Sequence, residues 1–417
     1  MLYSRRSTDR SVQMQVVRSA VEAVLFSVNK KKAMWIAVAG WIVLFIAVST
    51  IIVVNGNRSV VPAYRTAALN WMSGQHLYDS RGVGGFVYLP QSAVLFVPFA
   101  LFPPTVGEIL WRLGMIVVFA AGLYRFGRLA GERSAGDFFP LLSLVTIPLV
   151  WDCARNGQAT LIITGLMLLA VADMANSRWW RATLWLSLGI AIKPLVLVLV
   201  LLVMAIDRRL TWRLIVGMGV TALSPFLTQA PGYVVQQYIA CVQNMATAAH
   251  VGVLIQGWTS PFTALRALGI IDVPENIQTA IRLAGAIATL LLCFFVKRRL
   301  EPSRAALYLF TLASLYLILF SPRTENNTYA MLSPAIAAFL ASAFLVELRR
   351  RQGLLLAVMV LLLVGSRFVE RLLAPHAEQV WLSPFVAVLF AAYAIIQLFK
   401  DTANPFAGEN VTRPGIS

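Results

Sequence analysis

Long apolar runs constrain this chain more than any other feature. The segment from Ala33 to Asn57 contains no charged side chain, and similar runs begin near residues 106, 138, 158, 214, 276, 303, 330, 352 and 381. A membrane-spanning helix needs about 20 mostly apolar residues. Charged residues make up only 13% of the chain, against about 25% in soluble domains. We therefore expect an all-α polytopic transmembrane bundle with about ten full spans plus a broken helical hairpin.

Lys and Arg residues gather in alternate connections between the apolar runs. The clusters are Lys30–Lys32, Arg125 with Arg128 and Arg133, Arg208 with Arg209 and Arg213, Lys297–Arg299, and Arg349–Arg351. Short cytoplasmic loops are enriched in these residues, so both chain ends are predicted to be cytoplasmic. The net charge of +17 follows from this topology. It does not mark a basic domain face, and no nucleic-acid partner is expected.

The same pattern divides the chain into three parts. Residues 1–33 form a cytoplasmic segment whose residues 11–28 carry an apolar stripe typical of an interfacial helix. Residues 34–398 form the transmembrane domain, with external loops at 55–105 and 229–275, and residues 399–417 form a cytoplasmic tail. The first apolar run is long enough to span, which favours an uncleaved anchor over a signal peptide.

Three stretches interrupt the alternation of spans. Tyr88–Phe102 is too short to cross, so a re-entrant or interfacial segment is expected. Residues 182–206 lie between two basic clusters and are divided by Lys193-Pro194. Proline removes a helix hydrogen bond, so this stretch predicts a broken hairpin whose tip, at Lys193, reaches a cavity open to the outside. Residues 229–275 are the largest external loop, with one or two interfacial helices.

Lys193 is the most informative single residue. A lysine in the middle of an apolar membrane segment is costly and indicates function by default. The phosphate of a lipid substrate would compensate its charge. The alternative is a lysine that contacts water or headgroups at a hairpin tip.

Two polar connections lie on the same predicted side as Lys193. The first is the sequence Arg155-Asn156-Gly157-Gln158, which precedes a predicted helix start, where an anion is favoured. The alternative is an ordinary polar turn in which Arg155 pairs with Asp152. The second is Ser321–Tyr329. There, Arg323 is suited to clamping a phosphate and Glu325, Asn326 and Asn327 to binding hydroxyl groups; the alternative is a weak Arg323–Glu325 surface pair.

A carboxylate also lies in the first external loop. Asp79, which follows Tyr78, is suited to taking a proton from a hydroxyl nucleophile, and its alternative role is that of a turn residue. The three cysteines cannot form a disulfide framework, and the three histidines are far apart in sequence. We expect no metal and no cofactor.

These motifs, in this order, resemble those of glycosyltransferase family 87, within the GT-C class of polyprenyl-phosphate-sugar-dependent enzymes. The matching pieces are Val61–Ala67, Leu77–Asp79, Phe86–Pro90, Gly157-Gln158, Ile192–Pro194 and Ser321-Pro322. The resemblance covers roughly residues 35–345. Within the family, the chain resembles the mannosyltransferase-like members. It implies a GT-C-like fold, no nucleotide-sugar donor and inversion at the transferred sugar.

The chain departs from the family pattern at two places. The family usually carries an aspartate, the expected catalytic base, a few residues before the tyrosine matched by Tyr64, where this chain has Ser59 and Val60. The family's last loop often carries a histidine pair where this chain has Asn326-Asn327, and asparagine is no base at neutral pH. Asp79, then Glu325, are therefore the candidate bases.

The predicted function is transfer of a hexosyl or pentosyl group from a polyprenyl-phosphate donor to a lipid or glycan acceptor. The site faces outward from the bacterial cytoplasmic membrane, among membrane lipids. Lys193, Arg323 and Arg155 are expected to hold the donor phosphate. The side chains expected to hold sugar or acceptor are Tyr64, Arg65, Tyr78, Tyr88, Asn156, Gln158, Asn326, Asn327 and Tyr329. Two alternatives stay open: a transporter or flippase of a lipid-linked glycan, which broken helices also suit, and a catalytically inactive homologue.

Overall fold

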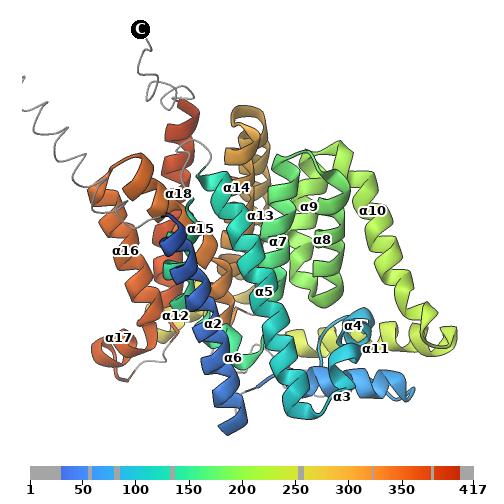
Figure 1. Ribbon diagram of the computed structural model, residues 1–417. Helices are drawn as coiled ribbons and strands as arrows, with labels where there is room; N and C mark the ends of the chain where they lie inside the picture. Colours follow the sequence, from blue (N-terminus) through green and yellow to red (C-terminus); the bar gives the residue numbers. More distant parts are fainter. Residues whose placement is uncertain are drawn as a thin grey trace, which may run out of the picture.

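The protein is a bundle of helices (Figure 1). The computed structural model describes residues 30–54, 59–78, 85–131, 137–251, 258–321, 324–376 and 380–403, and these residues contain no β-strand. The long helices are α2 (Lys30–Val54), α5 (Pro104–Ala130), α6 (Phe139–Asn156), α7 (Thr160–Ala175), α10 (Arg208–Leu223), α11 (Pro231–Val251), α13 (Glu275–Arg299), α14 (Pro302–Phe320), α16 (Arg350–Val364) and α18 (Leu382–Ala403). The shorter elements are α3 (Val61–Met72), α4 (Pro90–Ala100), α8 (Trp179–Ile192), η2 (Pro194–Val196), α9 (Leu197–Ile206), η3 (Ser224–Leu227), α12 (Pro261–Ala267), η4 (Asn326–Met331), α15 (Ser333–Ala341), η5 (Ser342–Val346) and α17 (Ser366–Leu373).

The all-helical membrane fold is confirmed, whereas the count of ten full spans is not. Within the described residues, seven helices are long and apolar enough to cross a membrane, or eight if the bent pair α16 and α17 counts as one span. The runs predicted near 138 and 158 form α6 and α7, which are not among them. Helix α6 ends in the polar sequence Asp152–Asn156, and α7 has only 16 residues. Almost all of α7 is buried in protein, so it needs no lipid-facing length.

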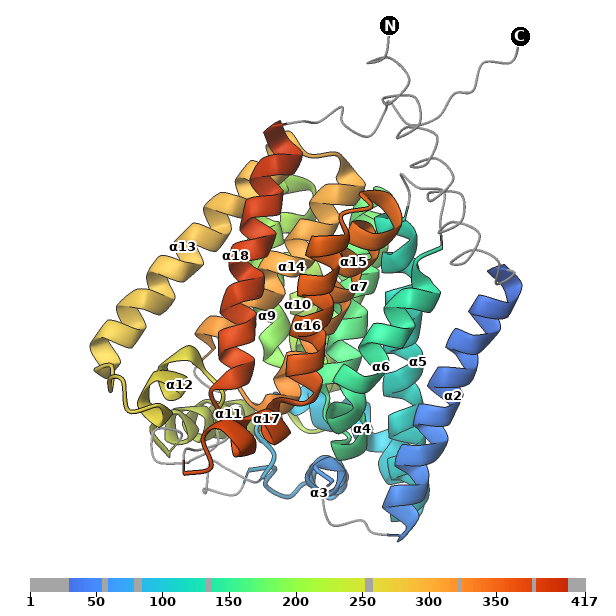
Figure 2. The ribbon, with the colours of Figure 1, turned by 90° about the vertical axis from the view of Figure 1, so that its left-hand side faces the viewer.

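The two ends of the bundle differ in charge. The basic residues at the start of α8, α10 and α16 and at the end of α5 and α13 all lie toward the upper end in Figure 1. Helices α3, α4 and α11 lie at the opposite end, across the direction of the long helices (Figures 1 and 2). The predicted separation of basic and site-bearing segments therefore corresponds to two ends of one bundle.

The broken hairpin predicted at residues 182–206 is present. Helix α8 ends at Ile192, Lys193 is extended with φ −150° and ψ 122°, and η2 and α9 follow from Pro194. The two arms fold back on each other, since a Cβ added at Gly189 would meet the Val196 side chain at 3.0 Å. At 14 and 10 residues, α8 and α9 are each too short to cross a bilayer. The turn between α8 and α9 lies above α4 in Figure 1, and Lys193 in this turn is half-buried.

Close packing of α5 against α7 fixes the start of α7, where site residues lie. A Cβ at Gly122 would come within 2.5 Å of the Gly165 carbonyl oxygen, and one at Gly165 within 2.6 Å of the Val118 carbonyl oxygen. Small residues at such crossings let helix backbones approach closely in membranes. The contact leaves these two helices little freedom to slide.

The predicted interfacial segment at residues 88–102 contains α4. Its 11 residues end just before Pro103-Pro104, and α5 begins at once. The segment predicted as an interfacial helix at residues 11–28, and the tail from residue 404, lie outside the described residues.

Candidate functional site

Residues from three separated segments meet toward the end of the bundle opposite the basic clusters. The side-chain nitrogen Nε2 of Gln158, just before α7, donates a hydrogen bond to the Glu325 carboxylate at 2.7 Å. The buried Cys153 thiol interacts electrostatically with both Glu325 and Lys193, so the hairpin tip adjoins the same region. The structure thus brings together three predicted site residues that the sequence separates by up to 167 positions.

Lys193 is held by a hydroxyl group and an aromatic ring. Its Nζ donates to Thr160 Oγ1 at 2.9 Å and lies 5.7 Å from the centroid of the Tyr88 ring. No carboxylate forms a salt bridge with Lys193 among the residues that the structure describes. The ammonium group is half-buried and has donors to spare, which suits an incoming anion.

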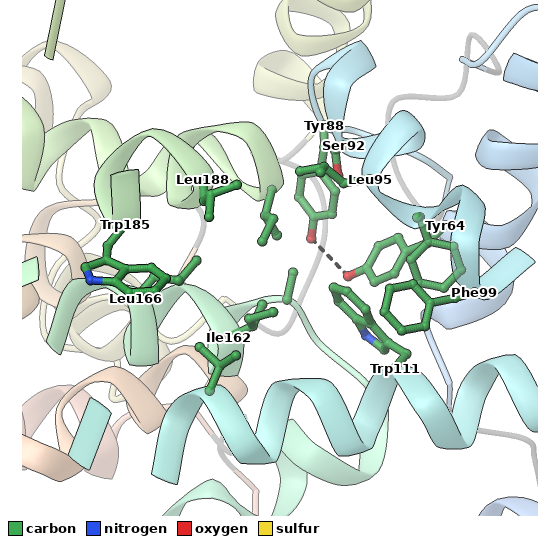
Figure 3. Close-up of a pocket in the computed structure, with 14 residues that line it drawn as sticks. Tyr64, Tyr88, Ser92, Leu95, Phe99, Trp111, Ile162, Leu166, Trp185 and Leu188 are labelled. Atoms are coloured by element: carbon green, nitrogen blue, oxygen red, sulfur yellow. Dashed lines mark hydrogen bonds between the residues drawn. The ribbon is translucent and has the colours of Figure 1, made fainter. Parts of the chain in front are cut away.

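An apolar cavity of about 250 Å³ opens beside this lysine. It is lined by α3, α4, α5, α7 and α8, and Ile192, the residue before Lys193, forms part of its wall. Figure 3 shows Tyr64, Phe99 and Trp111 on one side and Trp185 on the other. The lining is almost entirely apolar or aromatic, so the cavity fits a hydrocarbon chain better than a sugar.

Three tyrosines join the first external loop to the cavity. The hydroxyl groups of Tyr64 and Tyr88 are 3.2 Å apart, and the Tyr78 hydroxyl donates to the Tyr88 carbonyl oxygen at 2.7 Å (Figure 3 shows the first pair). Burial raises the pKa of Tyr64 and of Tyr78 well above the ordinary value of a phenol. Both residues therefore stay protonated near neutral pH and serve as hydrogen-bonding groups rather than bases.

A buried ion pair that sequence analysis missed supports the turn before Gln158. Arg112, which is fully buried, binds Glu108 at 2.9 Å, and its guanidinium donates to the Arg155 carbonyl oxygen at 2.9 Å and to Ser59 Oγ at 3.0 Å. Ser59 Oγ in turn donates to Glu108 at 2.8 Å. The network ties α5 to the last turn of α6 and fixes the entry into α3. The spacing of Glu108 and Arg112, i and i+4 at the start of an apolar run, was the available signal.

The helix α11 was also missed as a support of the site. It presents Gln237, Tyr238, Cys241 and Asn244 to the loop that contains Tyr78 and Tyr88. These side chains contact the Leu77 amide at 3.1 Å, the Gln91 side chain at 3.0 Å, the Tyr88 carbonyl oxygen at 3.6 Å and the Phe86 carbonyl oxygen at 3.2 Å. The spacing of the four residues along one helical face was the sequence signal.

Several predicted site residues form hydrogen bonds within the protein. Arg65 donates to the Phe102 carbonyl oxygen at 2.7 Å, and the Tyr329 hydroxyl donates to the Thr259 carbonyl oxygen at 2.8 Å. Asn326 accepts from Ser383 Oγ at 3.3 Å. The buried Asn327 Oδ1 has no hydrogen-bond partner among the described residues, and such an atom is uncommon in a folded protein.

The turn of Arg155, Asn156 and Gly157 closes α6. Gly157 has a φ of +68°, and the Asn156 carbonyl oxygen accepts from the Val60 amide at 3.0 Å. Arg155 lies in the last turn of α6. The alternative pairing with Asp152 is not formed, although the structure describes both residues.

Asp79 and Arg323 lie outside the described residues, and their predicted roles stay predictions. No group of three or more His, Cys, Asp or Glu side chains that could hold a metal ion occurs in the described part of the chain.

Comparison with known proteins identifies the chain at family level. The model of glycosyltransferase family 87 matches residues 86–322, which include α4, the hairpin and the approach to Glu325. No curated protein matches the chain. The matched region contains Lys193, the Gln158 turn and every residue of the cavity wall except Tyr64. The chain is therefore a multi-pass membrane protein that belongs to glycosyltransferase family 87.

Proposed function

We propose that this membrane glycosyltransferase takes a hexosyl or pentosyl group from a polyprenyl-phosphate donor and passes it to a lipid or glycan acceptor. The observation that carries the proposal is the position of one cation at the edge of an apolar cavity. Lys193 directly follows the wall residue Ile192 and lies against the wall residue Tyr88. A prenyl phosphate has the same order of parts, a hydrocarbon chain and then an anion.

The donor would bind with the first part of its prenyl chain among Leu166, Leu188 and Trp111. Its phosphate would then contact the Lys193 ammonium, which already has Thr160 Oγ1 as a partner at 2.9 Å. Charge-assisted hydrogen bonds to a phosphate are stronger than neutral ones. Arg155 and Arg323 are proposed as further phosphate contacts.

The sugar would lie between Lys193 and the Gln158–Glu325 pair. Amide and hydroxyl side chains suit sugar hydroxyls, and Gln158, Asn327 and Tyr88 supply them from three segments. Asn156 and Asn326 are proposed as outer contacts of the same group, with Tyr64 and Tyr78 shaping its other side.

In the proposed chemical step, the acceptor hydroxyl oxygen bonds to the anomeric carbon while the bond from that carbon to the phosphate oxygen breaks. The phosphate keeps the electron pair of the broken bond, and Lys193 offsets its increased negative charge. A carboxylate, Glu325 or Asp79, receives the proton of the acceptor hydroxyl. A single displacement of this kind inverts the anomeric centre.

The proposed site faces the outside of the bacterial cytoplasmic membrane. The basic helix ends lie at one end of the bundle and the Gln158–Glu325 pair at the other, which supports this placement under the positive-inside rule.

Release of polyprenyl phosphate tests the function directly. Purified protein would be supplied with a panel of polyprenyl-phosphate sugars and with membrane lipids as acceptors. Release of polyprenyl phosphate together with a glycosylated product supports the proposal. Movement of an intact lipid-linked sugar across a vesicle membrane without such release would favour a transporter, and binding without either event would favour an inactive homologue.

A further inference from the structure

A second polar cluster lies at the basic end of the bundle, away from the proposed sugar site. Its centre is Asp173 of α7, a carboxylate with no solvent exposure. Two nitrogens of Arg125 donate to its two oxygens, and Trp185 Nε1 donates to it at 2.8 Å. This carboxylate is thus compensated by one arginine and one indole, as a buried charge requires.

Two more arginines reach the same carboxylate without being needed there. Arg178 lies 3.8 Å and Arg181 3.5 Å from Asp173, at or beyond the limit of an ordinary hydrogen bond. Their side chains are 52% and 53% exposed. Three guanidinium groups therefore surround one carboxylate, and the N–H donors of the outer two face the surface.

The neighbouring surface has the residues of a membrane interface. Trp180, between the two outer arginines in sequence, is 55% exposed and packs edge-on against Trp212 of α10 with ring centroids 5.2 Å apart. The guanidinium of Arg213 lies 5.4 Å from the Trp180 ring and 4.5 Å from the Trp212 ring. Exposed tryptophans are enriched at the level of lipid headgroups. The exposed guanidinium groups of Arg178 and Arg181 are therefore placed at the level where the phosphates of the bilayer lie.

We propose that Arg178 and Arg181 form a binding site for the phosphate of an anionic phospholipid at the basic end of the bundle. Asp173, fixed by Arg125, positions the two outer arginines. Trp180 and Trp212 contact the glycerol and the upper acyl chains of the bound phospholipid. A planar guanidinium matches two phosphate oxygens at once, which favours a specific site over diffuse attraction. Arg178 and Arg181 do not line the cavity proposed for the prenyl chain, whereas Trp185 contacts both that cavity and Asp173.

The test compares two pairs of arginines at the same end of the bundle. Arg178 and Arg181 are changed to glutamine in one variant, and the exposed Arg350 and Arg351 of α16 in the control. Both variants lose the same charge, whereas only the first loses the cluster beside Asp173. Binding of phosphatidylglycerol and of zwitterionic phosphatidylcholine to the purified full chain in non-ionic detergent is measured by native mass spectrometry.

We expect R178Q/R181Q to weaken phosphatidylglycerol binding by about tenfold or more, and R350Q/R351Q by less than about twofold. R178K/R181K, which keeps the charge but lacks the planar guanidinium, should recover binding only in part, and phosphatidylcholine binding should not change. Equal losses of phosphatidylglycerol binding in the two glutamine variants would show that the lipid is attracted by net positive charge alone, and would overturn the proposed site. Displacement of the lipid by millimolar inorganic phosphate would likewise overturn a lipid-specific site.

Discussion

Gln158 and Glu325 are joined by a hydrogen bond of 2.7 Å across 167 residues of chain. The bond links the turn between α6 and α7 to the start of η4, where Glu325 also forms a capping box with Thr328. The carboxylate is thereby oriented both by the side-chain amide of Gln158 and by the backbone N–H of Thr328 in the capping box. This geometry makes Glu325 the candidate base whose surroundings the structure describes.

Replacing Glu325 by glutamine should remove most turnover while donor binding persists. The glutamine side chain keeps the shape and can still accept from Gln158, so only the proton acceptor is lost. A general base contributes about 10²–10⁴-fold, which sets the expected decrease in kcat. Single-turnover rates and donor affinity would be measured side by side, with Asp79→Asn as the competing variant. If Asp79→Asn alone abolishes turnover, the base is Asp79, and if neither variant does, the proposed step is wrong.

Replacing Lys193 by alanine should weaken donor binding about ten- to a hundredfold, because hydrogen bonds to charged groups contribute about 1.5–3 kcal/mol. Acceptor affinity should change little. Equilibrium binding of a polyprenyl-phosphate sugar measures the first quantity, and the KM for acceptor reports the second. The variant Lys193→Arg, which keeps a cation at the cavity edge, should restore part of the affinity. An unchanged donor affinity in Lys193→Ala would assign the lysine to water or headgroups.

Filling the cavity should affect donors with long prenyl chains more than those with short ones. Leu188 lines the cavity, whereas Leu184, one turn earlier on α8, is 51% exposed and does not. Leu188→Phe is expected to raise the KM for a long-chain donor about fivefold or more, and Leu184→Phe should leave it unchanged. A truncated donor whose chain is too short to enter the cavity serves as the internal reference. Equal KM values for the long-chain donor in both variants would show that the chain binds elsewhere.

Gly157 should tolerate no larger residue. Its φ of +68° costs an L-residue about 1–2 kcal/mol, and an added Cβ would also meet Val61 Cγ2 at 2.4 Å. Gly74 has nearly the same φ, +69°, but open space around its Cβ position. Gly74→Ala therefore measures the backbone cost alone. Thermal unfolding in detergent should show Gly157→Ala to be less stable than Gly74→Ala by a further 1 kcal/mol or so. Equal stabilities would mean that Val61, at the start of α3, moves away from the added methyl group at little cost.

Single cysteines should be labelled from opposite sides of the membrane. On a background without Cys153, Cys241 and Cys293, Gly232→Cys at the start of α11 is expected to react with an impermeant reagent in intact cells. Both positions are exposed, but Arg351→Cys at the basic end should react only after permeabilisation. The reverse pattern would place the proposed site inside the cell.

The helical fold and the hairpin could be predicted because their causes are local. Charge-free runs specify membrane helices. The proline of Lys193-Pro194 ends α8 whatever the hairpin packs against, because proline cannot continue the helix hydrogen bonds. The count of ten full spans is not confirmed, because an apolar run such as that of α7 has the same composition whether lipid or protein surrounds it. Its burial depends on α5 and α14, which sequence periodicity does not describe.

Sequence alone identifies residues that are anomalous on their own and misses those whose role arises from contact. Lys193 is conspicuous in an apolar run, and Glu325 lies in a strongly polar connection. In contrast, nothing in the sequence marks Ser59, Glu108 and Arg112 as a group until α3, α5 and α6 pack together. The backbone carbonyl contacts of Arg65 and Tyr329 could not be predicted either, because a polar side chain gives no sign in the sequence of which distant carbonyl oxygen it will contact.

The short arms of the hairpin impose an order on biosynthesis. Helices α8 and α9 leave the ribosome before α10, yet neither can anchor itself across the bilayer, and Lys193 cannot remain in lipid at low cost. We therefore expect the hairpin to insert stably only once α10 packs against it. A Cβ at Gly217 of α10 would come within 2.3 Å of Ser187 Oγ on α8. A larger residue at this position is expected to hinder that packing and so to lower the yield of correctly inserted protein.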